Sequence, residues 1–183
     1  MFRRMFLVSA GILAATAGLA ADLRPGTAVV ESDAGVFGAV FRVDGVPPDG
    51  SALFLDGKTL YCGAGCELRV YDVSDPLKPR LRSVADGIGH PRQVVARDGW
   101  AYVTARETGV WVVDARNPDR AKAVTRFDTI ELATGIDLAG DVLFVGQRVN
   151  GVEYVDVTDP AHPAHIGVTK TAESQSVVYR DGY

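Results

Sequence analysis

The chain has 183 residues, with 19 basic and 23 acidic side chains and a formal net charge of −4. A mildly acidic chain without a run of like charges is a poor candidate for nucleic-acid binding, which depends on basic patches. The composition is that of an ordinary globular protein, and the length allows one domain with a substantial core.

The first twenty residues have the pattern of an export signal. Arg3 and Arg4 precede an apolar run over Met5–Leu19, and Gly18 and Ala20 place small residues where a signal peptidase cleaves. Cleavage after Ala20 would leave 17 basic and 23 acidic residues, a net charge of −6. The run is shorter than the ~20 residues of a membrane span, so an uncleaved anchor is the less favoured alternative. We expect an exported protein, periplasmic or at the cell surface, with no membrane span in the mature chain.

Residues 21–50 are interpreted as a lead-in that carries one strand. Asp22–Asp33 is polar and turn-rich, whereas Val36–Val43 predicts a strand that ends at Asp44. Asp44 precedes Asp86 by 42 residues. The lead-in strand therefore matches the last strand of the repeat that follows, and we expect it to complete one such unit.

From Ser51 to Tyr183 the sequence repeats a pattern of short strands. The repeat step is 42 residues. It separates the prolines of the recurring turn, Pro76, Pro118 and Pro160, and also the aspartates that precede them, Asp72, Asp114 and Asp156. Each block holds runs rich in β-branched and aromatic residues, broken by Gly, Pro or Asp-Gly turns. A period of about 40 to 45 residues is typical of a four-stranded propeller blade.

Three whole blocks and the start of a fourth can be placed. Strands are expected at Ala52–Leu55, Thr59–Cys62, Leu68–Val73 and Leu81–Ala85; at Val94–Ala96, Ala101–Thr104, Val110–Val113 and Val124–Phe127; at Ile136–Leu138, Leu143–Val145, Val152–Val157 and His165–Val168; and at Ser176–Tyr179. The third strand of a block is apolar on both faces, which suits burial between neighbouring blades. A parallel α/β fold is disfavoured, since no helix-length segment separates the strands.

The fold class predicted is all-β, a β-propeller of four-stranded antiparallel blades that is incomplete in this chain. Propellers close with roughly four to eight blades, and an open stack exposes unpaired edges. We expect a piece of a longer propeller, with a ring formed by association as the alternative.

The recurring strand and turn resemble the LVIVD repeat family, in which Leu-Val-Ile-Val-Asp precedes a Ser/Thr-Asp/Asn-Pro turn. The matching stretches are Leu68–Asp72, Val110–Asp114 and Val152–Asp156. The second position departs from the aliphatic pattern, with Arg69, Trp111 and Glu153. The resemblance implies a propeller of exported or cell-surface proteins, and it brings no catalytic motif.

Candidate ligand-binding residues lie in two sets of loops that blade geometry places at one mouth of the ring. One set joins the second and third strands of a blade, at 62–67, 104–109 and 146–151, and the other leads into the next blade, at 86–92, 128–134 and 170–175. Converging polar groups in a hollow are the default binding hypothesis. The candidates are Asp86, His90, Arg92, Arg106, Glu107, Asp128, Glu131 and Arg148, with Glu67 beside them.

Two recurring sets of aspartates admit different interpretations. Asp44, Asp86 and Asp128 could form a partial ring of carboxylates for a cation or a basic group, although Lys170 breaks the series. Turn formation is favoured for this set, because Asp side chains bond to their own backbone. The same interpretation holds more firmly for the aspartates of the recurring turn, which begin with Asp72.

Cys62 and Cys66 are the only cysteines and are expected to form a structural disulfide in an oxidising compartment. The histidines His90, His162 and His165 make no metal-ligand pattern, and no nucleophile elbow, phosphate loop or haem-attachment motif occurs. We predict no cofactor, no catalytic residue and no metal site. Trp100 and Trp111 fall within strand patterns and are expected in the core.

The leading functional hypothesis is an exported, non-catalytic propeller that binds a cell-envelope protein, a glycan or another small ligand. One alternative is an enzyme with a metal or small-molecule site at the channel mouth. That enzyme would need histidines or carboxylates converging from different blades. A third alternative is a purely structural repeat in a larger envelope assembly.

Overall fold

The computed structural model describes residues 27–32, 35–41, 50–76 and 78–182. The chain divides into two compact units, residues 1–44 and 45–183. The predicted export signal and Asp44 lie outside the described residues. No helix in the described part is long and apolar enough to cross a membrane.

The first unit contains one antiparallel hairpin. Strand β1 (Thr27–Ser32) pairs with β2 (Gly35–Phe41), with an irregular register near Val30 and Glu31. The interpretation of 22–33 as a lead-in without a strand is therefore wrong over β1. The strand predicted at Val36–Val43 is confirmed as β2. Its role as the last strand of a blade stays a prediction.

The second unit contains three four-stranded antiparallel sheets, each a meander of consecutive strands. Blade 1 comprises β3 (Gly50–Asp56), β4 (Thr59–Ala64), β5 (Glu67–Asp72) and β6 (Arg80–Asp86). Blade 2 comprises β7 (Gln93–Arg97), β8 (Trp100–Thr104), β9 (Val110–Asp114) and β10 (Lys122–Phe127), with the 3₁₀ helix η2 (Pro118–Arg120) before β10. Blade 3 comprises β11 (Ala133–Ala139), β12 (Val142–Gln147), β13 (Gly151–Asp156) and β14 (Ala164–Thr169).

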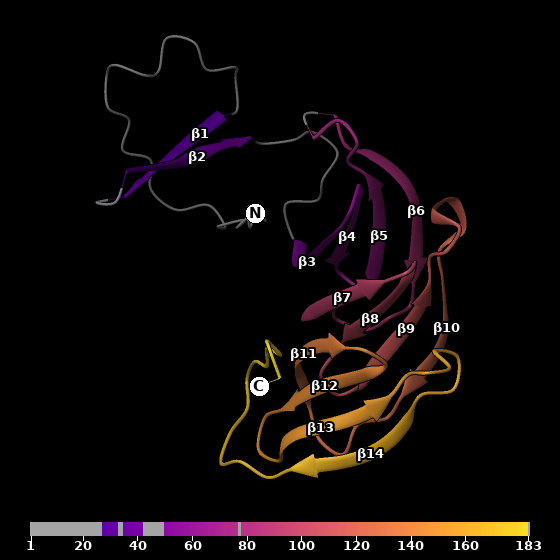
Figure 1. Cartoon of the computed structure of the whole chain (residues 1–183). Helices are drawn as coiled ribbons and strands as arrows, with labels where there is room; N and C mark the ends of the chain where they lie inside the picture. The colour runs from indigo at the N-terminus through magenta and orange to yellow at the C-terminus, as the bar shows by residue number, and fades with distance from the viewer. Residues whose placement is uncertain (1–26, 33–34, 42–49, 77, 183) are drawn as a thin grey trace. The chain divides into compact units, whose positions relative to one another are not determined.

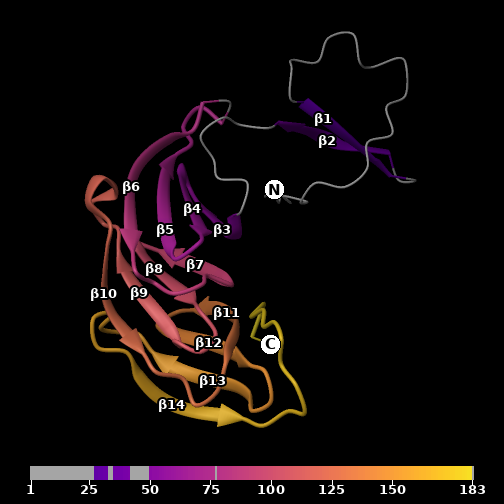
Figure 2. The same ribbon diagram turned by 180° about the vertical axis from the view of Figure 1, so that it is seen from behind.

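The three blades follow one another around an arc, as a propeller requires (Figure 1). Their first strands β3, β7 and β11 line the inner side, and their last strands β6, β10 and β14 form the outer edge, which the reverse view also shows (Figure 2). The twelve strands predicted between Ala52 and Val168 are all confirmed. The strand expected at Ser176–Tyr179 is wrong, because that segment makes no ladder with a partner strand.

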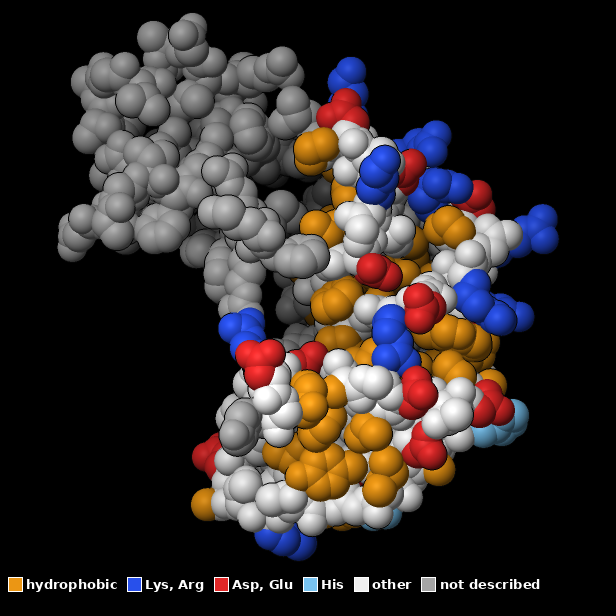
Figure 3. Space-filling model, viewed as in Figure 1, with side chains coloured by type: hydrophobic (Ala, Val, Ile, Leu, Met, Phe, Trp, Pro, Cys, Tyr) orange, Lys and Arg blue, Asp and Glu red, His pale blue; other side chains and the backbone are white. Residues whose placement is uncertain are grey.

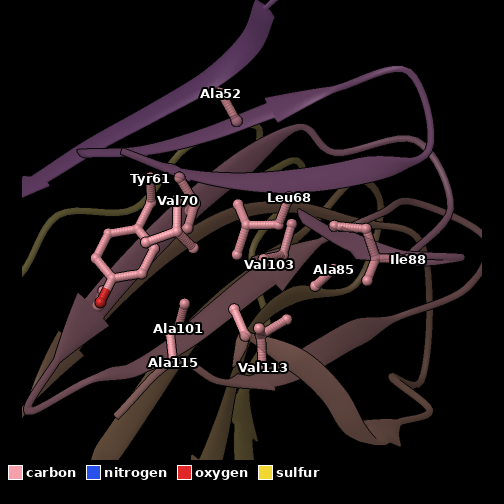
Figure 4. Close-up of a cluster of buried hydrophobic side chains, with 13 residues drawn as sticks. Ala52, Tyr61, Leu68, Val70, Ala85, Ile88, Ala101, Val103, Val113 and Ala115 are labelled. Carbon is pink, nitrogen blue, oxygen red and sulfur yellow. The ribbon is translucent and has the colours of Figure 1, made fainter. Parts of the chain in front are cut away.

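The core lies between the blades, as the apolar third strands predicted. Val113 faces blade 1, within a cluster that includes Leu68 and Val70 (Figure 4). Val110 and Val112, from the same strand, face blade 3 and pack in a second cluster with Leu143 and Val155. Strand β9 is therefore buried on both sides. Trp111 and Trp100 are partly buried and pack against the first and second clusters respectively.

The recurring aspartates cap the turn after each third strand, as predicted. Asp72, Asp114 and Asp156 each accept a hydrogen bond from the backbone N–H two residues later, at 2.9, 3.1 and 2.8 Å. Hydrogen bonds from the Ser74 side chain and backbone lower the pKa of Asp72 to about 2. The pKa of Asp156 is lowered by the same pair of bonds from Thr158.

Candidate binding site at the mouth of the blades

The two sets of predicted loops meet at one end of the blades, which we call the mouth (residues 62–67, 86–92, 104–109, 128–134, 146–151 and 170–175). Backbone hydrogen bonds join them at every step. The N–H of Ile88 donates to the carbonyl oxygen of Cys66 (3.1 Å), and Arg106 and Ala133 each donate to the other's carbonyl oxygen (3.1 and 3.2 Å). The N–H of Arg148 donates to the carbonyl oxygen of Leu132 (3.3 Å), and that of Ser174 donates to the carbonyl oxygen of Arg148 (3.4 Å). Loops far apart in sequence thus form one continuous surface.

A hollow of about 340 Å³ opens in this surface between blades 2 and 3. It brings together four of the eight predicted candidates, one pair from each set of loops. Its lining comprises Arg106, Glu107 and Gly109 from the β8–β9 loop and Asp128, Thr129, Ile130, Glu131 and Leu132 from the β10–β11 loop. Three carboxylates and one guanidinium therefore share the hollow with apolar side chains.

Arg106 is held in a backbone conformation that is uncommon for its residue type. Its φ is +49°, in the left-handed region that residues with a Cβ atom seldom adopt because the Cβ crowds the backbone. The paired hydrogen bonds with Ala133 fix this conformation. Such strain persists only where surrounding contacts impose it. The interblade bridge therefore determines where the Arg106 side chain leaves the backbone.

Gly109 lets the two loops approach each other closely. Its φ is +75°, and a Cβ at this position would collide with the carbonyl oxygen of Phe127. It would also lie tightly against the backbone of Thr129 and Asp128, at 3.2 and 3.3 Å. Gly151 occupies the same place in blade 3, where a Cβ would collide with Thr169. A side chain at Gly109 would push the walls of the hollow apart.

Glu153 anchors the β10–β11 loop from the interior. Its side chain is only 1% exposed. Its Oε2 accepts hydrogen bonds from the N–H of Ile130 at 3.1 Å and from the side-chain amide of Gln147, and its Oε1 lies 2.8 Å from Nδ1 of His165. Gln147 in turn accepts a 2.6 Å bond from Asn150. A carboxylate on β13 thus satisfies a loop N–H at the mouth.

Sequence reasoning missed the role of Glu153, although a signal was present. Glu153 occupies the second position of the recurring strand, where an aliphatic residue is usual and where blades 1 and 2 carry Arg69 and Trp111. A buried charge requires hydrogen-bonding partners. A polar residue between buried positions of β13 was therefore a sign of a network.

A second carboxylate ties the neighbouring loops together. Glu131 Oε2 accepts a 3.2 Å hydrogen bond from the N–H of Val149, and Arg148 N–H donates to Leu132 O. Val149 and Ile130 lie on the two loops that these bonds join, and 65% and 59% of their surfaces are exposed. Asp128, at the other end of the loop, pairs with Arg126 at 2.7 Å.

The other predicted candidates do not line the hollow. His90 lies at the blade 1 side of the mouth, with Nδ1 3.3 Å from Gly65 O and 3.9 Å from Cys66 Sγ. Asp86 and Arg92 are exposed there, and Glu67 pairs with Arg69 at 2.9 Å. Arg148 is exposed between the loops of blade 3. Lys170 donates to Asn150 at 2.5 Å.

The predicted Cys62–Cys66 disulfide is not formed, and that expectation is corrected. The hairpin turns over Gly65 and Cys66, so Ala64 pairs with Glu67 and Cys62 pairs with Arg69 across the ladder. Cys62 is buried on β4, whereas Cys66 is exposed at the tip of the turn. The register therefore separates the two thiols.

Possible metal ligands do not converge in the described part of the chain. No group of three or more His, Cys, Asp or Glu side chains there could hold a metal ion. Asp86 and Asp128, the described members of the predicted carboxylate series, lie at the ends of β6 and β10.

Comparison with known families assigns the repeat. Residues 88–129 and 132–171 match the LVIVD repeat. The chain carries LVIVD repeats. The first LVIVD match contains β7–β10 and the second contains β11–β14, so each repeat corresponds to one blade. The hollow lies where the two LVIVD repeats join. No curated protein matches the chain.

Solved structures share the fold of the LVIVD blades. The computationally designed Ika4 protein aligns with a TM-score of 0.61 and 13% identity, over 76% of this chain and 85% of Ika4. A functionally unknown protein from Desulfotomaculum acetoxidans aligns with a TM-score of 0.63 and 10% sequence identity, over 81% of this chain and 50% of that protein. The WD40 repeats of RRP9 align with a TM-score of 0.58 and 12% sequence identity, over 73% of this chain and 43% of the RRP9 chain.

At these identities the likeness concerns the fold, which is that of an incomplete β-propeller. The chain spans half or less of two of these three proteins. WD40 repeats build four-stranded propeller blades, the unit that the present chain repeats three times.

Proposed function

We propose that the chain is an exported binding module whose mouth holds a cell-envelope protein, a glycan or a small ligand. The observation that carries this proposal is the hollow between blades 2 and 3. Arg106, Glu107, Asp128 and Glu131 converge there from two segments, and hydrogen bonds across the blades fix the backbone on both sides. A preformed hollow with a few converging polar groups is the usual form of a binding site.

Rigid loops support the binding role. Ordering flexible loops on association reduces affinity, so a site whose backbone is already fixed binds more tightly for the same contacts. Here the N–H groups of Ile130 and Val149 are each held by a carboxylate. The propeller scaffold thus presents the mouth in one conformation.

Cross-linking in living cells tests the binding role. The photo-reactive amino acid p-benzoylphenylalanine is placed at position 130 in the hollow and, as a matched control, at position 166, an exposed Ile on the outer strand β14. We expect a discrete cross-linked product from position 130 and none from position 166, with its partner identified by mass spectrometry. Equal labelling at both positions would contradict a binding site at the mouth.

Export is proposed from the sequence of residues 1–20 alone. Expression of the whole chain in a Gram-negative host, followed by fractionation and intact-mass measurement, tests it. We expect periplasmic protein that begins at Ala21. Recovery of the chain with residues 1–20 retained in the cytoplasm would refute export without affecting the binding proposal.

A further inference from the structure

We infer that the mouth binds a protein segment in which a Lys or Arg side chain lies next to apolar residues, an inference that rests on the proposed binding function. Ile130 and Val149 form the apolar contact. Glu107 and Glu131 pair with the cation.

Ile130 and Val149 are among the three most exposed large apolar side chains in the described part of the chain, at 59% and 65%. They lie on adjoining loops that hydrogen bonds hold together, from Val149 N–H to Glu131 and from Arg148 N–H to Leu132. Exposed apolar side chains that gather on one surface with a polar rim are typical of protein interaction sites. Leu81, Val124 and Ile166, by contrast, lie singly on the outer strands of three different blades.

The backbone under these side chains is fixed before a partner arrives. Glu153, buried between blades 2 and 3, accepts the N–H of Ile130, and His165 and Gln147 hold Glu153 in turn. A contact residue on a fixed backbone loses little freedom on binding. The site therefore has a rigid apolar centre, and in protein interfaces such centres usually contribute most of the binding energy.

The charges of the hollow favour a cationic group. Three of its four charged side chains are carboxylates, and one of these, Asp128, is already paired with Arg126. Glu107 makes no ion pair within the described residues, and Glu131 uses only Oε2, for Val149. Carboxylates with open acceptor positions attract a cation, and complementary charge selects among partners.

Arg106 gives the same segment a second kind of contact. Its guanidinium is exposed in the hollow and forms no ion pair among the described residues. A guanidinium offers five N–H donors, which suit the carbonyl oxygens of an extended peptide. The hollow of about 340 Å³ is large enough for one long side chain with its neighbours.

Titration of the whole chain with short peptides, followed by amide NMR, tests the inference. The probes are acetyl-Leu-Lys-Leu-amide, the same peptide with Gln or Glu at its centre, and a neutral hexasaccharide. We expect the Lys peptide to shift the amides of Ile130 and Val149 to saturation, with an affinity about tenfold higher than that of the Gln or Glu peptide. Stronger binding of the Glu peptide, or shifts from the sugar alone, would overturn the inference.

Matched variants locate the contacts. Glu107→Gln is expected to weaken Lys-peptide binding about three- to tenfold and to leave Gln-peptide binding unchanged. Asp98→Asn, at an 89% exposed carboxylate in the β7–β8 turn outside the mouth, should change neither. Ile130→Ser should weaken both peptides about tenfold, whereas Ile166→Ser on β14 should not. Equal effects of Glu107→Gln and Asp98→Asn would overturn the assigned cation site.

The two proposals can fail separately. If no peptide binds but position 130 still cross-links specifically in cells, the binding module stands and the basic segment is refuted. If no peptide binds and cross-linking is equal at positions 130 and 166, both proposals are refuted.

Discussion

Glu153 shows how one buried charge can organise a surface site. Its carboxylate lies between blades 2 and 3 and receives bonds from Ile130, Gln147 and His165. Charged side chains are seldom fully buried without such partners, because transfer from water is costly. The residue connects the interior of the third blade to a loop of the mouth.

Removal of this carboxylate should destabilise the fold and release the loop. Glu153→Ala leaves the Ile130 N–H and the Gln147 amide without their acceptor, at about 1–3 kcal/mol for each buried group. We expect a loss of about 2–4 kcal/mol in urea unfolding and faster hydrogen exchange over residues 128–132. His165→Ala, at a half-exposed site, should cost much less. Equal losses in the two variants would contradict the anchoring role.

Asp72 should make the fold sensitive to acid. Its folded-state pKa of about 2 lies below the value of about 3.9 in an unfolded chain. A depressed pKa contributes stability above the unfolded value, and this contribution is lost as pH falls from about 4 through 2. Asp72→Asn should therefore flatten the acid limb of the stability curve in that window. Parallel curves for Asp72→Asn and the parent would refute this.

At the scale of single elements, each outer strand carries a β-bulge at the same place in the repeat. Arg82 in β6, Val124 in β10 and Ile166 in β14 are the residues left without a ladder partner, and they are 42 positions apart. Bulges break the regular edge that another strand could extend. The repeat thus protects the outer rim of every blade.

Glycines in the turns differ in what they make possible. Gly109 and Gly140 both have positive φ, but a Cβ at Gly109 would strike backbone, whereas nothing lies within 4 Å of one at Gly140. Gly140→Ala should cost only the left-handed penalty of about 1–2 kcal/mol. Gly109→Ala should cost at least about 2 kcal/mol more in urea unfolding and should perturb residues 127–129. Similar losses at both glycines would contradict the close approach of the loops.

Over the whole unit, burial depends on which blade follows. Tyr102 and Val112 of blade 2 face blade 3 and are 2% and 0% exposed. The residues 42 positions later, Phe144 and Tyr154, are only partly buried on the outer face of blade 3, where Figure 3 shows hydrophobic side chains gathered. Phe144 contacts Tyr154 edge-on at 5.3 Å and stacks on Tyr179 at 5.2 Å. Identical places in the repeat thus have different environments.

Truncation of Tyr102 and of Phe144 should lower the stability of the fold by different amounts, because the two rings are buried to different extents. Tyr102→Ala removes a ring packed between blades and should cost about 3–5 kcal/mol in urea unfolding. Phe144→Ala, on the open face, should cost less than half as much. Equal costs would show that the two faces are equally covered in solution.

The sequence by itself determined the blade, its period and its strands. Alternating β-formers, Asp-Gly turns and the Asp at the end of each third strand act through local contacts, and local contacts leave a local pattern. It also placed the two sets of loops at one mouth, and four of its candidates line the hollow. Only the tertiary structure decided the rest, namely the register that separates Cys62 from Cys66, the bridge between Arg106 and Ala133, and the link from Glu153 to Ile130. The first depends on where the β4–β5 hairpin of blade 1 turns. The other two join residues of neighbouring blades, so they exist only once the blades have packed.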